Sequence, residues 1–221
     1  MDLTIVLLVT IGSSMLISTF AIFGAHDTPA TSLAPLYSAN FLFQEIIGLV
    51  LLLYVLSRQG RRLADIGVSI RLRDFPWSIL LFMAFSICYT AGSRVIALWA
   101  PQEGGATTPE LVTMGAAPLV ALAGITLVNP IFEEVIVRAY FATELTALLG
   151  NRWTAAAVTV LVQSYYHLYQ GWRPAAGYGV GFAVFAVYFA LSRRVAPVII
   201  AHMFLDGLGF YGLWAEMHKA A

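Results

Sequence analysis

Apolar runs about as long as a membrane is thick follow one another along almost the whole chain. A helix needs about 20 mostly apolar residues to cross the hydrocarbon core of a bilayer. With 60% hydrophobic and only 11% charged residues, the chain has too little polar surface for a soluble domain. The candidate spans are residues 3–24, 38–57, 76–100, 112–149, 153–169, 174–192 and 196–215. The sequence therefore predicts an all-α, polytopic bundle of about seven transmembrane helices.

Nothing in the sequence divides the chain, so residues 1–221 are predicted to form a single integral membrane domain. The formal net charge is zero, which leaves no basic surface for nucleic acid. The lone Cys88 cannot form an internal disulfide. Because no lysine or arginine precedes Arg58, the first apolar run lacks the basic start of a secretory signal and is predicted to be a retained span.

The placement of arginine predicts the orientation. Arginines crowd the stretch between the second and third candidate spans, whereas residues 25–37 and 101–111 contain no lysine or arginine. Cytoplasmic loops of membrane proteins carry the excess of these residues. We therefore expect residues 58–75 and the N-terminus to lie in the cytoplasm, with the protein in the inner (plasma) membrane. The arginines of that stretch are Arg58, Arg61, Arg62, Arg71 and Arg73.

The fourth apolar segment, residues 112–149, is too long for one crossing. Its 38 residues would extend about 57 Å as a straight helix, at 1.5 Å per residue. Pro130 can kink or break the segment, because proline removes one helical hydrogen bond. Alternatively, the C-terminal half projects beyond the bilayer.

Ionisable side chains inside spans are energetically costly and are functional candidates by default. Glu45 is isolated and is interpreted as a neutral or hydrogen-bonded helix residue. Arg94 lies near the end of its span, where it can reach the interface. All the others fall in the second half of the chain. The complete set is Glu45, Arg94, Glu133, Glu134, Arg138, Glu144, His167, His202 and Asp206.

Two carboxylates are adjacent in "NPIFEEVIVRAYF". Glu134 and Arg138 are four residues apart on a helix, in the order that favours an ion pair. Glu133 is turned by about 100° from Glu134 and therefore faces elsewhere. The pair is interpreted as structural, which leaves Glu133 available for another role.

A tight turn at Gly150 and Asn151 predicts that Glu133 and His167 lie side by side. Glu133 lies 17 residues before Gly150 and His167 lies 16 residues after Asn151. In an antiparallel helical hairpin these positions are level, about 25 Å from the turn.

His202 and Asp206 repeat the four-residue spacing in "HMFLD". The aspartate can fix the tautomer of the histidine, or both can point at one ligand. Straight helices would leave His202 about 13 Å from the depth of His167. The glycines at positions 171, 177, 179 and 181 offer a way to delay the intervening helix or to let the chain re-enter the membrane.

These residues are compatible with more than one chemistry. A glutamate and a histidine at one level can activate a water for attack on a peptide carbonyl, and a second histidine can stabilise the oxyanion. Glu133, His167 and His202 could instead hold zinc. Metal-free chemistry is preferred, because the HExxH signature of soluble zinc proteases is absent. Each group alone is also compatible with helix packing.

Three motifs together resemble the CPBP family of intramembrane proteases, which is related to the type II CAAX prenyl endopeptidases. "EEVIVR" matches the EExxxR motif of that family, "QSYYH" corresponds to FxxxH, and "HMFLD" corresponds to HxxxN or HxxxD. The flanking "RVAPVIIAHMFLD" and "HLYQG" are also similar to bacterial members, and "RRLADIGV" is a weaker match. The resemblance covers about residues 115–210.

The resemblance implies an intramembrane endopeptidase that acts on a membrane-embedded, CAAX-like or lipid-anchored substrate within the lipid bilayer. It implies that Glu133 and His167 activate water and that His202 and Asp206 bind the oxyanion. Glu134 and Arg138 would support them. No cofactor is expected, although zinc is possible. Gln163 replaces the motif phenylalanine, and we expect this position to pack near the site.

Two other classes of function compete with proteolysis. A non-catalytic member of the family could act in bacteriocin self-immunity or as a partner-binding scaffold, and Gln163 is the feature that favours it. A proton-coupled transporter would use the buried carboxylates. It ranks last, because the first three spans offer few polar residues beyond Glu45 for a continuous pathway.

Overall fold

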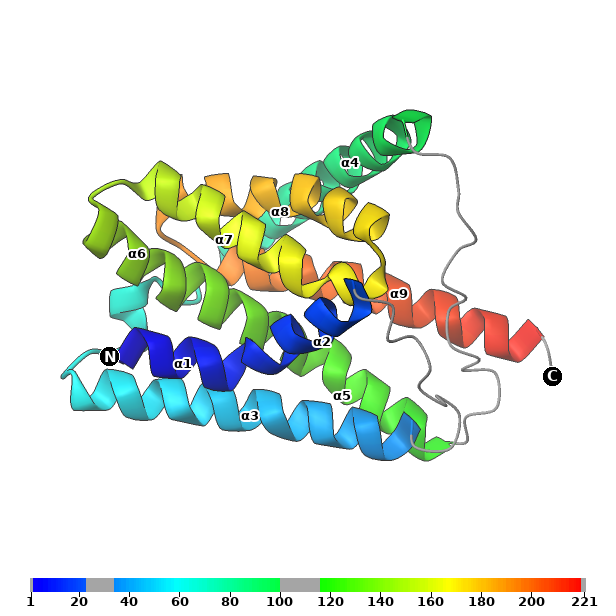
Figure 1. Cartoon of the computed structure of the whole chain (residues 1–221), viewed down its shortest axis with the longest axis horizontal. Coiled ribbons are helices and arrows are strands. Elements are labelled where there is room, and N and C mark those ends of the chain that lie inside the picture. Colours follow the sequence, from blue (N-terminus) through cyan, green and yellow to red (C-terminus); the bar gives the residue numbers. More distant parts are fainter. Residues whose placement is uncertain (1, 23–33, 100–115, 220–221) are drawn as a thin grey trace.

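The computed structural model describes residues 2–22, 34–99 and 116–219, and these residues form helices and short connections without any strand (Figure 1). The all-α class is therefore confirmed. The α-helices are α1 (Asp2–Thr10), α2 (Gly12–Ile22), α3 (Ala34–Arg58), α4 (Asp74–Trp99), α5 (Ala116–Glu133), α6 (Ala142–Leu149), α7 (Arg152–Tyr166), α8 (Trp172–Ser192) and α9 (Ala196–Lys219). The 3₁₀-helices η1 (Leu63–Ile66) and η4 (Leu168–Gln170) and the π-helix η3 (Glu134–Phe141) lie between them.

Three of the described helices are long and apolar enough to cross a membrane, and a bent pair makes a possible fourth. They are Asn40–Arg58 of α3, Asp74–Trp99 and Trp172–Ser192, with α1 and α2 as the bent pair. The protein is thus an integral membrane protein, but the predicted number of about seven spans is not confirmed. α7 has only 15 residues, and the apolar part of α9 ends at Gly212.

The first predicted span, residues 3–24, is broken in the structure. α1 and α2 meet at an angle of 53° at Ile11, and residues beyond Ile22 lie outside the described part of the chain. Near the end of α2 the buried Ser18 Oγ donates to the carbonyl of Tyr166, 2.8 Å away, and accepts from the backbone amide of Tyr169 at 3.3 Å. The bend therefore brings α2 against the turn that carries His167.

The fourth predicted span forms one helical rod that changes type along its length. α5 continues past Pro130, so proline does not break the segment. The irregularity begins at Glu134, where the π-helix η3 starts, and all eight of its residues are buried. A π-helix closes its hydrogen bonds over five residues and is often found at functional sites. The rod ends in α6, where Glu144 Oε1 lies 2.5 Å from Arg61 Nη1.

Glycines in α8 allow neighbouring helices to pack very closely against it. A Cβ atom at Gly177 would lie 2.5 Å from Ser93 Oγ of α4, and one at Gly179 would lie 2.5 Å from Ser164 Oγ of α7. A Cβ at Gly181 would lie 2.7 Å from the ring of Phe85. Small residues permit such close approach between membrane helices. α8 is a continuous helix through these glycines, so the suggested re-entrant loop is wrong.

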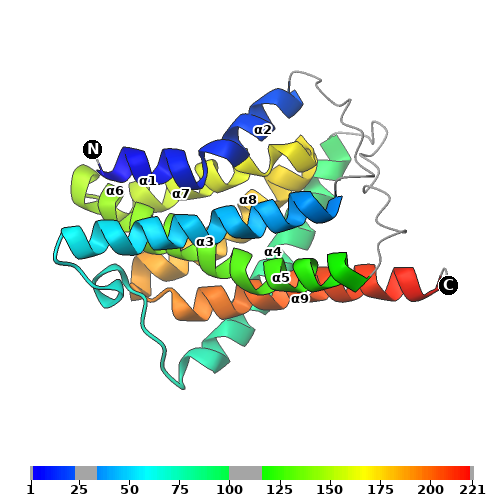
Figure 2. The ribbon, with the colours of Figure 1, turned by 90° about the horizontal axis from the view of Figure 1, so that it is seen from below.

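The termini and loops of the described helices fall at two opposite ends of the bundle (Figures 1 and 2). Asp2 accepts a hydrogen bond from Gln59, which places the start of α1 beside the end of α3. The 59–73 connection packs on residues 193–195, because Val195 N donates to the Gly67 carbonyl at 3.1 Å. Arg194 and Asp74 add an ion pair of 2.5 Å. The arginine-containing loops therefore share one end with the N-terminal helix.

Two ionisable residues lie away from the cluster in the second half of the chain. Glu45 is only 2% exposed, and neither of its carboxylate oxygens has a hydrogen-bond partner among the described residues. Of the two interpretations of Glu45, the hydrogen-bonded one is therefore not seen, and a neutral carboxyl stays a prediction. Arg94 is exposed on the last third of α4, as expected for a residue that reaches towards the interface.

Candidate active site

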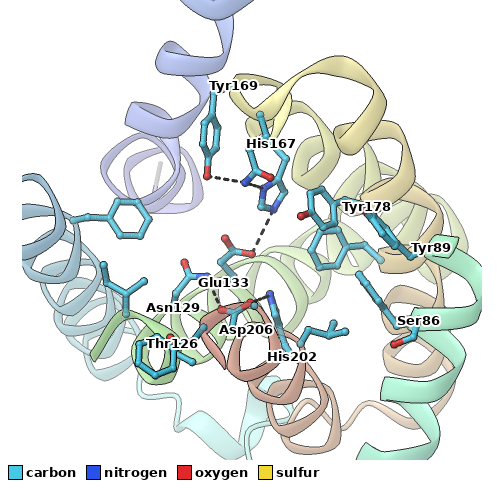
Figure 3. Close-up of a pocket in the computed structure, with 18 of the residues that line it drawn as sticks. Ser86, Tyr89, Thr126, Asn129, Glu133, His167, Tyr169, Tyr178, His202 and Asp206 are labelled. Carbon is cyan, nitrogen blue, oxygen red and sulfur yellow. Dashed lines mark hydrogen bonds and ion pairs between the residues drawn. The ribbon is translucent and has the colours of Figure 1, made fainter. Parts of the chain in front are cut away.

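A cavity of about 590 Å³ lies between α4, α5, α8 and α9, with the turn after α7 at its edge (Figure 3). All four residues that the sequence predicts to be catalytic line this cavity. They come from three separate parts of the chain: Glu133 ends α5, His167 follows α7, and His202 and Asp206 lie on α9. Tyr178 and Phe182 of α8 and Tyr89 of α4 form much of the apolar wall.

Glu133 and His167 face one another across a short gap. Glu133 Oε2 lies 3.9 Å from His167 Nε2, and both side chains are largely buried. The separation is too long for a direct hydrogen bond, and Nε2 has no hydrogen-bond partner among the described residues. The expectation that the helical hairpin would bring these two residues to the same level is confirmed.

The imidazole of His167 is held by its own turn and by aromatic rings. His167 caps the C-terminus of α7, and its Nδ1 lies 3.3 Å from Gln170 Nε2. Its ring stacks on that of Phe182, with centroids 5.6 Å apart and planes at 18°. These contacts on one ring nitrogen and one ring face leave Nε2 directed at Glu133.

His202 lies between two carboxylates. Its Nδ1 is 3.0 Å from Glu134 Oε1, and its Nε2 is 3.6 Å from Asp206 Oδ1. Because a carboxylate only accepts hydrogen bonds, the closer contact requires a proton on Nδ1. The proton on Nδ1 is therefore held by Glu134 of η3, and a role of Asp206 in fixing the tautomer stays a prediction.

The rings of His202 and His167 both lie 5.6 Å from the ring of Phe182, measured between centroids. Straight, parallel helices would have separated the two histidines in depth. The glycines of α8 instead let α4 and α7 pack closely against it. This packing brings the two histidines to one aromatic side chain without any re-entrant backbone.

Glu134 and Arg138 form the predicted ion pair in a fully buried position. Arg138 Nε lies 3.6 Å from Glu134 Oε2, and both side chains are 0% exposed. Arg138 also donates to the Phe182 carbonyl at 3.3 Å. Glu133 forms no ion pair with Arg138, as expected from its different direction on the helix. The pair lies directly behind the cavity.

Gln163 was expected only to pack near the site, but its amide connects the charged residues. Its Nε2 donates to Glu133 Oε2 at 3.2 Å and to Glu134 Oε1 at 3.5 Å, and its Oε1 accepts a hydrogen bond from Arg138. The side chain is 0% exposed. Its place four residues before His167 was visible in the sequence, but an uncharged amide gave no reason to expect these contacts.

Asn129 is a further polar residue of the site that the sequence reasoning missed. It lines the cavity, and its Nδ2 lies 3.4 Å from Asp206 Oδ2. Asn129 is four residues before Glu133, and residues at this spacing lie on the same face of a helix. That spacing was the available signal.

No group of three or more histidine, cysteine, aspartate or glutamate side chains within residues 2–22, 34–99 and 116–219 is arranged to hold a metal ion. Glu133 and His167 approach one another at 3.9 Å, and His202 contacts Glu134 through Nδ1. Zinc held by Glu133, His167 and His202 stays a prediction.

Comparison with known proteins identifies one family. Residues 115–208 match the family model described as type II CAAX prenyl endopeptidase Rce1-like, and this stretch runs from the start of α5 to the middle of α9. No curated protein and no solved structure matches the chain. The match includes all three motifs and every residue of the charged cluster. Residues 115–208 are therefore similar to Rce1-like type II CAAX prenyl endopeptidases, which confirms the resemblance to the CPBP family.

Proposed function

We propose that the protein is an intramembrane endopeptidase that hydrolyses a peptide bond of a membrane-associated substrate. The observation that carries the proposal is the pair of Glu133 Oε2 and His167 Nε2, 3.9 Å apart on the wall of a 590 Å³ cavity. A water molecule about 2.8 Å from each atom fits this gap, which is hydrogen-bonding distance. A carboxylate and an imidazole on one water are suited to general-base catalysis.

The chemistry requires only these groups and water. Glu133 takes a proton from the water while the water oxygen bonds to the carbonyl carbon of the substrate. When the carbon–nitrogen bond breaks, the proton passes from Glu133 to the departing amine, so that the carboxylate is restored. His167 holds the water and keeps it directed at the carbonyl.

The opposite wall of the cavity is suited to the oxyanion. Nδ1 of His202 donates to Glu134, so only the imidazolium form, which carries a second proton on Nε2, can donate to a developing negative charge in the cavity. Asp206 as a carboxylate can only accept hydrogen bonds, whereas the amide of Asn129 beside it has two donors. We therefore assign oxyanion binding to His202 and Asn129, with Asp206 orienting both.

The family and the cavity both support the proposed substrate class. The family name describes endopeptidases of prenylated CAAX sequences, and the volume of the cavity is in the usual range for ligand sites, about 300–1,000 Å³. A CAAX-like or otherwise lipid-anchored peptide is the proposed substrate. Neither Glu133 nor His167 needs a metal for this mechanism.

The test compares two glutamate-to-glutamine substitutions on one helical rod. The purified protein in detergent is incubated with a library of internally quenched peptides that carry a C-terminal lipid anchor. Glu133→Gln is expected to lower the cleavage rate by about 10³-fold, since general-base catalysis contributes about 10²–10⁴-fold. Glu144→Gln is the matched control, because Glu144 pairs with Arg61 outside the cavity.

Equal cleavage by the wild-type protein and the Glu133→Gln variant would show that Glu133 is not the general base, and no cleavage by either protein would favour a partner-binding protein. Metal dependence is read in the same assay. Dialysis against a strong zinc chelator is expected to leave the rate unchanged. A loss of cleavage that returns on addition of zinc would replace the metal-free mechanism with a metal-dependent one.

A further inference from the structure

Tyr166 lies beside both residues of the catalytic pair, on the same face of α7 as Gln163. It follows Gln163 by three residues and directly precedes His167. Residues three or four apart are neighbours on the surface of a helix. The residues on either side of it approach one oxygen of Glu133: Gln163 Nε2 lies 3.2 Å from Oε2, and His167 Nε2 lies 3.9 Å from it. The side chain of Tyr166 is therefore held next to the general base.

The hydroxyl of Tyr166 is buried among charged groups. The residue is 3% exposed, and Glu133 is the strongest electrostatic partner of its hydroxyl, ahead of Glu134 and Arg138. The two side chains are in contact, but the hydroxyl has no partner among the described residues at full hydrogen-bond geometry. Catalytic hydrogen bonds are often long without substrate and tighten in the complex. A buried hydroxyl without an acceptor costs free energy that phenylalanine would avoid, so the hydroxyl indicates a partner, and the acceptor that it faces is Glu133.

Glu133 lies between two cavities, and Tyr166 belongs to only one of them. The cavity of about 590 Å³ has Glu133 and His167 in its wall but not Tyr166. A smaller cavity of about 180 Å³, whose wall includes residues of α2 and α3, is lined by Glu133, Tyr166 and His167 together. Tyr166 therefore reaches Glu133 from the side of the smaller cavity, where it takes no space from a substrate in the larger one.

The backbone and the ring of Tyr166 are both held in place. Its carbonyl accepts a hydrogen bond from Ser18 Oγ of α2 at 2.8 Å. Its ring packs against the imidazole of His167, with centroids 4.8 Å apart and planes at 40°. A hydroxyl on a ring that is fixed in this way has one direction, and a group with one direction can orient another.

The other contacts of Glu133 do not fix the plane of its carboxyl group. Gln163 and His167 both approach Oε2, and contacts at a single oxygen allow the carboxyl group to turn about that oxygen. A general base acts only from within hydrogen-bonding reach of the proton that it takes, so its orientation matters. A phenol hydroxyl can donate a hydrogen bond, and a carboxylate only accepts. Tyr166 is thus suited to supply the additional donor.

We propose that Tyr166 positions the general base: its hydroxyl donates a hydrogen bond to the carboxylate of Glu133 and keeps that carboxylate directed at the water. The inference rests on the proposed peptidase function. Tyr166 is a positioning residue and not a catalytic one, because it acts through Glu133 and does not line the cavity assigned to the substrate.

Two adjacent tyrosines provide a matched comparison. Tyr166→Phe removes only the hydroxyl of a buried ring. Tyr165→Phe, the control, removes a hydroxyl that pairs with Thr19 Oγ1 at 2.8 Å, and neither Tyr165 nor Thr19 lines a cavity with Glu133. Both variants are assayed with the quenched, lipid-anchored peptides. Tyr166→Phe is expected to lower kcat by about 10-fold with little change in KM, since misplacement of a catalytic group can cost about 10²-fold.

Tyr165→Phe is expected to keep both constants. An unchanged kcat in Tyr166→Phe, a change confined to KM, or an equal loss of kcat in the two variants would each overturn the inference. An equal loss would mean that either hydroxyl serves only the packing of α7.

Infrared spectroscopy tests the hydrogen bond itself without turnover. The carboxyl stretching band of Glu133 is assigned as the band that disappears in Glu133→Gln. We expect Tyr166→Phe to shift this band and Tyr165→Phe to leave it in place. No shift, or a shift of another carboxyl band instead, would overturn the inference. A shifted Glu133 band in a protein that cleaves no peptide would contradict the peptidase proposal and not the contact between Tyr166 and Glu133.

Discussion

Two adjacent glutamates of one helix have very different surroundings. Glu133 belongs to a cavity-side group with His167, Asn129 and Asp206, in which the closest contacts between partners are 3.4 Å and 3.9 Å. Glu134 belongs to a buried group with Arg138 and Gln163, in which every side chain is 0% exposed. The cavity-side group has room for water and substrate, whereas the buried group fixes directions. His202 contacts both groups, through Glu134 of the buried group and Asp206 of the cavity-side group. The buried group therefore holds the His202 ring in place at the cavity.

Removal of the buried cation should have the largest effect on stability. Arg138→Met leaves Glu134 buried without its partner, and breaking a buried pair costs about 3–5 kcal/mol. We expect this loss in the free energy of unfolding, measured by denaturant titration in detergent. Arg152→Met, at the exposed start of α7, is the matched control and should change stability much less. Equal stability of the two variants would remove the distinction between the groups.

Removal of the cavity-side amide should affect the rate and not the stability. Asn129→Ala is expected to lower kcat by about 10²-fold with little change in KM, because one oxyanion donor contributes about 10²–10³-fold. Asn40→Ala, at an exposed position of α3, is the control. A change in KM alone would show that Asn129 binds the ground state of the substrate and not the oxyanion.

The amide that joins both groups should affect both properties moderately. Gln163→Met keeps the length of the side chain but removes its hydrogen bonds to Glu133, Glu134 and Arg138. We expect a loss of about 1–3 kcal/mol in unfolding free energy, typical of unsatisfied buried groups, together with a lower kcat. Thr159→Val, one turn earlier on α7, removes a bond within that helix only and should leave kcat unchanged. A Gln163→Met enzyme with normal kcat would show that the hydrogen bonds of Gln163 do not couple the buried group to catalysis by the cavity-side group.

The smallest effect is expected at the end of the bundle where the 59–73 connection packs on residues 193–195. Glu144 and Arg61 form an ion pair of 2.5 Å, but their side chains are 23% and 27% exposed. Partly exposed pairs contribute about 0–1 kcal/mol. Glu144→Gln should therefore keep both the cleavage rate and the unfolding free energy close to those of the wild type. A large loss in either would place Glu144 within the buried group.

The features of the site that depend on chain geometry were predictable from the sequence. The turn at Gly150 and the rise of a helix fix the level of Glu133 against His167, and the four-residue spacing fixes the pairing of Glu134 with Arg138. The contacts of Gln163 and Asn129 were not predictable in this way, since uncharged polar residues in a span have many possible partners. The π-helix had no signal in the sequence, because it depends on packing and not on local preference.

The depth of His202 shows the limit of reasoning from single helices. If the helices were straight, His202 and His167 would lie at different depths in the membrane. The glycines of α8 were therefore interpreted as places where the backbone could leave the helix. In the structure those glycines are contact points, where α4 and α7 approach α8 to distances that no larger residue would permit. The inclination of helices follows from such contacts between elements, which a single sequence does not display.

The hydroxyl of Ser18 shows that the functional unit is larger than its signature. This hydroxyl, on α2, binds the backbone on both sides of His167, through the carbonyl of Tyr166 and the amide of Tyr169. It lies about a hundred residues ahead of the stretch that matches the family. Transplanting residues 115–208 into a foreign scaffold would carry over every motif. The turn that carries His167 would then lack the two hydrogen bonds that Ser18 makes to it. A minimal engineered protease should therefore retain the bent first helix pair.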